Sequence, residues 1–556
     1  MAAVSLAAIV ALRAGLHAAE GEGSSVSGWV FETGTGAPVR GALVYLRRWA
    51  VGGTYSTETG PDGSFALHNL PADEYGYGVS LDDVRYLPNL HGRAASLVRL
   101  GAGETVSQLN WRATPRSVLC GRVFDDQGEP MQGADVSAIR QEWLTGEQRW
   151  VNVKSAETND LGEYSLAALA PGSYCVFASG RLGTSANFFE WRPPETVRQG
   201  RGEKEMLLAG AFYDGAAGIA HARRIELVPG RTVGGIDLHL PLKPAHHIRG
   251  TVDRASVGPG HNTLTFSADY VQASLVEDGQ DSDWGGYTAW VGDDGTFDVA
   301  VPSGTYYLER RGNHGAQTSR ISRVSVAGSD KTGVELSSKK VNIRIRAELE
   351  GGPATDLGGI TLQWQLADHP GNTTGETRAN GGGWTDDLWP GRYRMMFSVY
   401  APAIPYHVKE ALIGGSKRLE DPVVDLRSGD PLELKVILKK GRGQAVTGVI
   451  DRSNGDNYST AILVPEGPGL GARQLSFAGI DQRGAFLVFA VPGKYRAYAV
   501  EEFDQGLWEN PEFTKRLSEF GTPVDVGASP GKTEAQVQIH GITASQVSAV
   551  AAGLGQ

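Results

Sequence analysis

One pattern of alternating apolar and polar residues recurs along the chain. Its clearest copy, residues 158–178, reads TNDLGEYSLAALAPGSYCVFA, with apolar side chains at every second position before and after Pro171-Gly172. A period of two places alternate side chains on one face of a strand, and Pro-Gly is typical of a chain reversal. The segment therefore predicts a β-hairpin.

The same elements occur five times. The turn residues Gly28, 36–38 and Gly41 of the first copy match Gly121, 128–130 and Gly133 of the second in the same order, with one residue fewer after the first glycine. The later copies keep the turn before the last tyrosine, whereas the first has Pro71-Ala72-Asp73 in place of Pro-Gly-x-Tyr and the fourth is the most divergent. We expect the tyrosine after this turn to pack in a sandwich core or to cap its edge.

The repeats predict an all-β protein, a tandem array of about five small antiparallel β-sandwich domains of the Ig or transthyretin-like type. Each repeat holds about six or seven short strands and no long helix. A short helix is expected near residues 511–520, followed by two strands and frayed last residues. The expected units are a signal peptide at 1–22, repeat 1 at 23–114, repeat 2 with an insertion at 115–244, repeat 3 at 245–338, a divergent repeat 4 at 339–441, and repeat 5 with the C-terminal tail at 442–556.

Composition agrees with a chain rich in turns. The 556 residues include 75 glycines and 27 prolines, a share below that of low-complexity sequences. The formal net charge of −11 is spread thinly, and no Lys/Arg-rich run could follow a phosphate backbone. We therefore expect no nucleic-acid partner.

The first 22 residues resemble a secretory signal peptide. An apolar stretch at 2–12 is followed by the small residues Ala18 and Ala19, although the n-region lacks Lys and Arg and Arg13 follows the apolar core. A wrongly chosen start codon or a buried N-terminal helix is the alternative. No later stretch approaches the length of a membrane span, so the mature chain is expected to be secreted, periplasmic or at the cell surface, with no transmembrane span.

The repeated residues resemble the motifs of a known family. The pattern VxGxV, GxPVxGAxVxL and TDxxGxFxLxxLPPGxYxV, seen at 26–79 and 119–176, resembles the carboxypeptidase regulatory-like domain, a transthyretin-like β-sandwich grouped with carbohydrate-binding-like folds. The wider order of motifs is similar to multi-repeat exported proteins of this type found in acidobacteria. The resemblance implies the fold strongly and function weakly, because its motifs are turn and core positions.

The two cysteines, Cys120 and Cys175, lie in the same repeat, one on its first predicted strand and one on its last. If those strands meet, a disulfide would close a loop of roughly 56 residues and stabilise the protein by roughly 4 kcal/mol. Export would permit such a bond. Two free buried thiols are the equal alternative.

The sequence contains no convincing catalytic or metal-binding constellation. Acidic pairs at predicted turns, Asp125-Asp126, Asp293-Asp294 and Asp386-Asp387, could help to hold a structural Ca²⁺, but turn-forming aspartate explains them better. His246-His247 has no ligand at metal-binding spacing and is interpreted as a solvated linker. No cofactor is expected.

Aromatic residues outside the repeat template are the best functional hint. They occur in Gly- and Asp-rich segments interpreted as loops: Trp284, Tyr287, Trp290, Trp384 and Trp389. Exposed aromatic rings beside carboxylates suit sugar stacking and also serve as anchors of protein interfaces, whereas packing of the loops on the sandwich is the plainer alternative.

Three functions follow in order of preference. The first is an exported, non-catalytic array that binds carbohydrate, such as a polysaccharide, or another envelope component, including an envelope protein. The second is a structural or protein-interaction module of a surface assembly or fibre, with self-association through edge strands or exposed aromatics. An unrecognised hydrolase comes last.

Overall fold

A computed structural model describes residues 23–48, 52–81, 85–87, 96–144, 146–180, 196–199, 204–216, 218–252, 270–278, 280–311, 319–320, 323–336, 340–350, 358–366, 373–380, 383–388, 390–399, 406–415, 417–419, 423–440, 444–450, 458–466, 475–501, 503–527 and 534–555. The predicted signal peptide at 1–22 therefore lies outside the described residues. None of the described helices is both long and apolar enough to cross a membrane.

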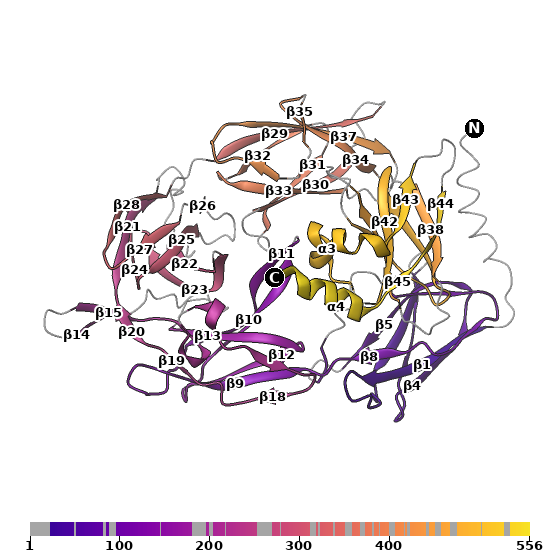
Figure 1. Ribbon diagram of the computed structural model, residues 1–556, viewed down its shortest axis with the longest axis horizontal. Helices are drawn as coiled ribbons and strands as arrows, with labels where there is room; N and C mark the ends of the chain where they lie inside the picture. Colours follow the sequence, from indigo (N-terminus) through magenta and orange to yellow (C-terminus); the bar gives the residue numbers. More distant parts are fainter. Residues whose placement is uncertain are drawn as a thin grey trace.

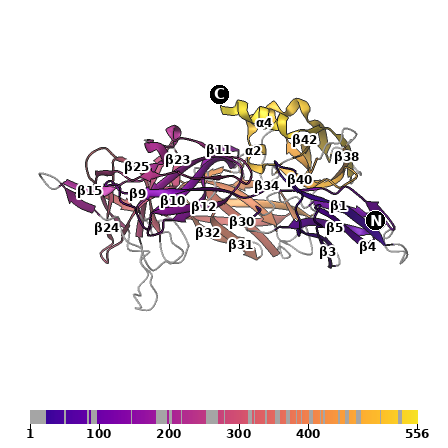
Figure 2. The same ribbon diagram turned by 90° about the horizontal axis from the view of Figure 1, so that it is seen from below.

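The chain forms five antiparallel β-sandwiches, which confirms the predicted fold class. They follow one another around a ring, so that the fifth returns to lie beside the first (Figure 1). The C-terminal helix α4 lies on one face of this ring (Figure 2). We number the sandwiches 1 to 5 in chain order.

All five sandwiches share one topology. In one sheet the first strand pairs antiparallel with the fourth and parallel with a strand near the end of the unit. In the other sheet the second strand lies between the third and the fifth, and the fifth also pairs with a later strand. Alternate side chains of both sheets point inward and form a separate apolar core in each sandwich.

The strands have the following bounds. Sandwich 1 contains β1 (Ser24–Glu32), β2 (Leu43–Arg48), β3 (Thr54–Glu58), β4 (Ser64–Leu70), β5 (Asp73–Ser80), β6 (Ser96–Leu100), β7 (Thr105–Val106) and β8 (Trp111–Ala113). Sandwich 2 contains β9 (Ser117–Phe124), β10 (Asp135–Leu144), β11 (Glu147–Glu157), β12 (Glu163–Leu169), β13 (Gly172–Ser179), β16 (Ala211–Phe212), η1 (Tyr213–Gly215), η2 (Ile219–His221), β17 (Ile225–Leu227), β18 (Thr232–Val233) and β19 (Leu238–His239). A separate ribbon joins β14 (Thr196–Gln199), β15 (Lys204–Leu208) and β20 (Leu242–Pro244).

Sandwiches 3 and 4 continue the ring. Sandwich 3 contains β21 (His246–Val252), β22 (Tyr270–Glu277), β23 (Gln280–Trp290), β24 (Thr296–Val301), β25 (Gly304–Arg311), β26 (Ser319–Arg320), β27 (Val324–Val326) and β28 (Lys331–Leu336). Sandwich 4 contains β29 (Val341–Leu349), β30 (Gly358–Leu366), β31 (Thr373–Asn380), β32 (Gly383–Leu388), β33 (Arg392–Val399), β34 (Tyr406–Ile413), β35 (Lys417–Arg418), β36 (Val423–Asp425) and β37 (Leu432–Lys440).

Sandwich 5 carries the described α-helices, which begin directly after β42. Its elements are β38 (Gln444–Ile450), β39 (Thr460–Pro465), β40 (Ser476–Gly479), β41 (Ala485–Ala490), β42 (Gly493–Val500), α2 (Gln505–Trp508), α3 (Pro511–Arg516), η5 (Ser518–Phe520), β43 (Thr522–Val526), β44 (Glu534–Ile539), β45 (Gly541–Ile542), α4 (Ala544–Ala552) and η6 (Gly553–Gly555). The helix expected near 511–520 is present as α3 and η5. The expected fraying was wrong, because a capping box at Thr543 begins α4.

The segment predicted as a β-hairpin is not one. Strand β12 pairs with β9 in one sheet, and β13 pairs with β10 in the other. The Pro171-Gly172 turn therefore connects the two sheets across the edge of the sandwich. Two strands joined by a chain reversal show the same sequence pattern whether they lie in one sheet or in two. The pattern therefore could not distinguish a hairpin from a connection between sheets.

The tyrosine after this turn is buried, as expected. Its hydroxyl donates to the carbonyl four residues earlier in four sandwiches: Tyr75 to Pro71 (2.6 Å), Tyr174 to Ala170 (2.7 Å), Tyr306 to Pro302 (2.8 Å) and Tyr495 to Val491 (2.8 Å). This is the geometry of a tyrosine corner. The first repeat keeps the corner although its turn motif has degenerated.

Candidate functional site

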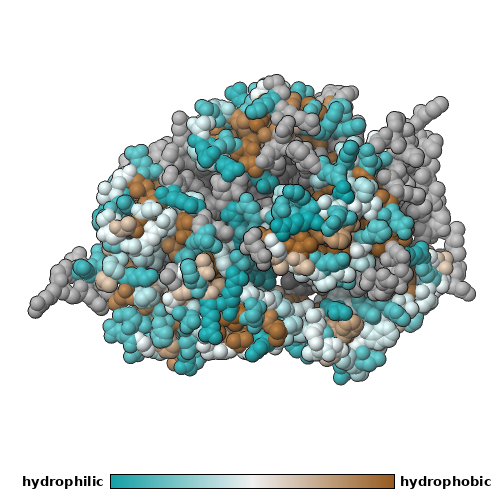
Figure 3. All heavy atoms as spheres, viewed as in Figure 1, coloured by the Kyte–Doolittle hydropathy of each residue, from teal (hydrophilic) through white to brown (hydrophobic). Residues whose placement is uncertain are grey.

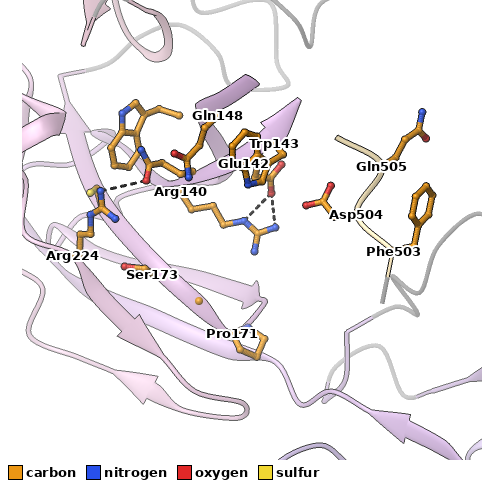
Figure 4. A pocket seen from close by; sticks show the side chains of 14 residues that line it. Arg140, Glu142, Trp143, Gln148, Pro171, Ser173, Arg224, Phe503, Asp504 and Gln505 are labelled. Atoms are coloured by element: carbon orange, nitrogen blue, oxygen red, sulfur yellow. Dashed lines mark hydrogen bonds and ion pairs between the residues drawn. The ribbon is translucent and has the colours of Figure 1, made fainter. Parts of the chain in front are cut away.

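A cleft with a volume of about 680 Å³ lies between sandwich 2 and the start of the helical segment of sandwich 5 (Figure 4). Its floor comes from strands β10, β11 and β13, and its far wall from residues 503–505. The residues that line the cleft include Arg140, Glu142, Trp143, Ser173, Arg224 and Asp504.

The cleft exists because strand β10 runs past its partner. Strand β10 pairs with β13 only as far as Ile139, which lies opposite Cys175. It then continues to Leu144 and remains paired with β11 alone. The free part of these two strands, residues 140–144 and 147–151, forms an arm that reaches sandwich 5, and the cleft lies along its base.

Two glycines fix the tip of the arm on sandwich 5. The Gly146 amide donates to the Gly506 carbonyl (3.0 Å), and the Asn510 side-chain amide donates to the Gly146 carbonyl (2.7 Å). A Cβ atom on Gly506 would lie 1.8 Å from the Trp143 carbonyl oxygen, and one on Gly146 would lie 2.6 Å from that of Glu509. Only glycine permits this approach of two backbones.

Paired charges occupy the middle of the cleft. The Arg140 guanidinium donates to the Glu142 carboxylate (2.8 Å from Nε) and to the Tyr174 hydroxyl (3.3 Å). Although burial opposes the change, the Glu142 hydrogen bond and charge raise the pKa of Arg140. The tyrosine corner of sandwich 2 thus anchors the base of the arm.

A second guanidinium lies over an aromatic ring. The Arg224 guanidinium lies 5.2 Å from the ring centre of Trp150 and donates to the Gln141 side-chain oxygen at 3.4 Å. Among the described residues no carboxylate pairs with Arg224. Nearby, the Ser173 Oγ is buried and has no hydrogen-bond partner in the described part of the chain.

The protein environment raises the pKa of two other groups in the cleft. Removal of water raises the pKa of the Asp504 carboxyl, and the negative charge of Glu142 adds to this effect. Burial likewise raises the pKa of the Cys175 thiol, although the positive charge of Arg224 opposes it. The cleft therefore combines donors and acceptors, and Cys175 is held in its uncharged form.

The predicted aromatic site is not one exposed cluster. Trp284 is buried at 3 % exposure, where it packs between strand β23 and the outer face of sandwich 2 beside Trp150 and Phe177. Tyr287 is half-buried with its ring 6.0 Å from that of Tyr306, and burial raises its pKa. Trp290 is 41 % exposed, with its ring 6.3 Å from that of Tyr270.

These three residues lie on strand β23 and not in a loop, so the loop interpretation was wrong. Trp284 cannot act as an exposed platform because sandwich 2 covers it. Trp384 lies on strand β32 opposite Ile345, and Trp389 lies outside the described residues. The sequence showed the aromatic residues, but neither the strand that carries them nor the neighbouring sandwich that buries Trp284 was visible in it.

Cys120 and Cys175 are free thiols, which agrees with the second of the two alternatives left open by the sequence and not with the disulfide. Strand β9 carries Cys120 in one sheet and β13 carries Cys175 in the other. Their neighbours Leu119 and Tyr174 point into the core of sandwich 2. The two thiols therefore lie on opposite outer faces of the sandwich.

Two of the three acidic pairs lie in turns that their side chains stabilise. Asp125 Oδ1 accepts from the amides of Gln127 and Glu129, each at 2.9 Å, and Asp294 Oδ1 accepts from the amide and hydroxyl of Thr296. Asp386 and Asp387 lie on strand β32, so the turn predicted for this pair was wrong. Within the described ranges no three His, Cys, Asp or Glu side chains are placed to hold a metal ion.

The interpretation of His246-His247 as a solvated linker was wrong. Both residues begin strand β21, and the His247 ring lies 2.5 Å from Asp298 and 3.1 Å from Glu205. Burial opposes protonation, but the hydrogen bonds to Asp298 and Glu205 raise the pKa of His247. Because Glu205 belongs to strand β15, this histidine joins the ribbon to sandwich 3.

A second contact closes the ring between sandwiches 1 and 5. The turn before β41 places the buried Asp481 3.1 Å from Arg99 on strand β6, and Arg483 pairs with Glu104. The Gln482 side chain accepts from the Arg99 amide (3.1 Å) and donates to the Arg99 carbonyl. Sandwich 5 therefore contacts both sandwich 1 and sandwich 2.

Fold and contacts together define an all-β tandem array of Ig-like sandwiches closed into a ring. Neither a family model nor a curated protein matches the sequence.

Among solved structures, the TIE protein of Bacillus anthracis shares 13% identity over 72% of this chain and 69% of its own, with a TM-score of 0.15. A streptococcal ancillary pilin shares 13% identity over 56% of this chain and 98% of its own, with a TM-score of 0.17. GBS52, the minor pilin of Streptococcus agalactiae, shares 12% identity over 40% of this chain and 97% of its own, with a TM-score of 0.21. These values are too low to carry an argument about this chain.

Proposed function

We propose that the protein is an exported, non-catalytic structural module that acts through association of its sandwiches, as part of a surface assembly. This is the second of the functions considered from the sequence. The observation that carries it is an apolar outer face on sandwich 5. The closed ring supports the proposed role, because it holds sandwich 5 in place and so fixes the direction in which the apolar outer face points.

The apolar outer face follows from the sequence of strand β41, AFLVFA, which is apolar at every position. Phe486 and Val488 point into the core, so Leu487 and Phe489 point outward and are 38 % and 39 % exposed. Val449 on the neighbouring strand β38 is 55 % exposed on the same side. A strand that is apolar on both faces is typical of a sheet covered on both faces.

The partner for this face is a second copy of the chain. The face is built from two neighbouring strands of one sheet, and a two-fold axis would place each copy's Leu487 and Phe489 against the other's. Figure 3 shows another group of hydrophobic residues, over the C-terminal helices, ringed by hydrophilic ones. There the helices already pack on their own apolar cluster around Trp508 and Phe513.

The test is the molar mass of the full chain in solution, measured by light scattering after size-exclusion chromatography over a range of concentrations. We expect a dimer or larger species that Phe489→Lys converts to monomer. The matched control is Trp29→Lys, which changes an aromatic residue of 43 % exposure on sandwich 1 and should leave the association unchanged. A monomer at every concentration would contradict the proposal.

Export is tested separately by fractionation of cells that express the full chain. We expect the protein outside the cytoplasm, without residues 1–22. If the chain stays in the cytoplasm and retains its N-terminus, the proposed location at the cell surface is contradicted. The proposed self-association is not affected by that result.

A further inference from the structure

Ser173 and Arg224 meet on one face of the cleft in Figure 4. Strands β13 and β17 pair with Tyr174 opposite Ile225, and both of these side chains point into the core. Alternation therefore places Ser173 and Arg224 on the outer face, as diagonal neighbours across the strand pair. This face is the floor of the cleft.

Both groups have hydrogen-bond donors that the described residues do not use. The Arg224 guanidinium lies over the Trp150 ring, 5.2 Å from its centre, and the Gln141 hydrogen bond uses only one of its donors. The Ser173 hydroxyl is buried at the same place without a hydrogen-bond partner among the described residues. A planar guanidinium beside a hydroxyl donor is the arrangement that recognises a carboxylate.

The side of the cleft opposite Arg224 carries hydrogen-bond acceptors. Glu142 and Asp504 line it opposite Arg224, and Glu142 contacts Arg140 through a single oxygen. Trp143 and Phe503 line the same space and are partly exposed. A ligand that fits these walls carries a carboxylate at one end, hydroxyl donors at the other, and a flat apolar face between them.

We propose that the cleft binds an acidic saccharide, a sugar ring that carries a carboxylate. The carboxylate binds Arg224 and Ser173, and the ring hydroxyls donate to Glu142 and Asp504. An acidic peptide would satisfy Arg224 but brings few hydroxyl donors for the two carboxylates. This inference goes beyond the proposed function and does not depend on it.

Isothermal titration of the full chain with trigalacturonate and triglucuronate tests the site, with the corresponding neutral trisaccharides and a triglutamate peptide as comparisons. We expect at least one uronate to bind and both the neutral sugars and the peptide to bind at least tenfold more weakly. Arg224→Gln should weaken uronate binding by about 10- to 100-fold, because it removes hydrogen bonds from a charged donor. Ser173→Ala should weaken it by a smaller factor.

The matched control is Arg223→Gln, because Arg223 lies over the Tyr213 ring at 5.5 Å and does not line the cleft. This variant should bind the uronate as the unchanged protein does. The inference fails if neither uronate binds, if the neutral sugar or the peptide binds equally well, or if Arg223→Gln and Arg224→Gln have equal effects. Arg224→Gln should also leave the molar mass in solution unchanged, which separates this result from the test of self-association.

Discussion

Sandwiches 1 and 2 both contact sandwich 5, but they do so with different chemistry. Sandwich 1 presents the edge strand β6 to a charged turn, where Arg99 meets Asp481 and Glu104 meets Arg483. Sandwich 2 extends a long two-stranded arm whose backbone meets another backbone at Gly146 and Gly506. The first contact depends on charge and the second on the absence of side chains, so each should respond to different perturbations.

The difference begins in the length of two strands. Strands β2 and β3 of sandwich 1 have 6 and 5 residues, whereas β10 and β11 of sandwich 2 have 10 and 11. The longer pair creates both the arm and the cleft at its base. A longer strand pair therefore adds a cleft to this sandwich without adding a strand to its sheet.

The largest effect is expected from Gly506→Val, which places a side chain against the Trp143 carbonyl. It should abolish the contact of the arm with sandwich 5 and cost about 2–3 kcal/mol, the value of two buried hydrogen bonds. Hydrogen exchange of the Gly146 amide measures the loss of protection. Gly234→Ala is the control, since its nearest neighbour, the Cys120 sulfur, is 3.5 Å from the added Cβ. Retained protection in Gly506→Val would show that the approach is not tight.

Asp481→Ala should come next and act on the other contact. It removes the partner of Arg99 and the acceptor for the amides of Arg483 and Ala485, at a cost of about 2 kcal/mol. Urea unfolding of the full chain measures the loss, and the Arg99 amide should exchange faster. Asp481→Asn keeps an acceptor oxygen for the turn and removes only the charge, so an unchanged stability in this variant would contradict the role of the charge.

Acidification should weaken the same contact by a smaller amount. The Arg483 hydrogen bond lowers the pKa of Glu104, so its stabilising contribution is complete above the usual glutamate range and is lost as pH falls through the lowered value. Protection of the Arg99 amide, corrected for the intrinsic exchange rate, should hold from pH 7 to 5 and fall below about pH 4. Gly146 should not share this change, and a parallel loss at both amides would indicate general unfolding.

Salt should have the smallest effect. Arg483 is half-exposed, and an exposed ion pair contributes about 0–1 kcal/mol and is screened by 1 M NaCl. The Arg99 amide should therefore exchange slightly faster at high salt, and the Gly146 amide should not. An equal response of both amides would contradict the chemical difference between the two contacts.

The architecture of each sandwich was predictable because its signals are local. Alternation at Tyr164 and Leu166 indicated strands, and the turn chemistry at Pro171-Gly172 indicated a reversal of the chain. The pairing of those strands was not predictable, since a reversal within a sheet and one between sheets use the same residues. The choice between a disulfide and two free thiols stayed open for the same reason, because the disulfide required strands β9 and β13 to meet.

The contacts between sandwiches could not be predicted from the sequence. Gly146 and Gly506 resemble ordinary turn glycines, and only the folded chain shows that each faces a backbone from another sandwich. Trp284 looked like an exposed loop residue because nothing near it in sequence covers it. Arg224 and Ser173 of the cleft are far apart along the chain, so neither stood out.

The Gln482 side chain has one more consequence. Its amide pairs with both backbone groups of Arg99, as a neighbouring strand would, and so it covers part of the open edge of β6. An uncovered strand edge is a template for pairing with another chain. Ring closure and growth of a sheet through β6 therefore compete for the same hydrogen bonds. A fibre that used this edge could form only from molecules whose ring had first opened.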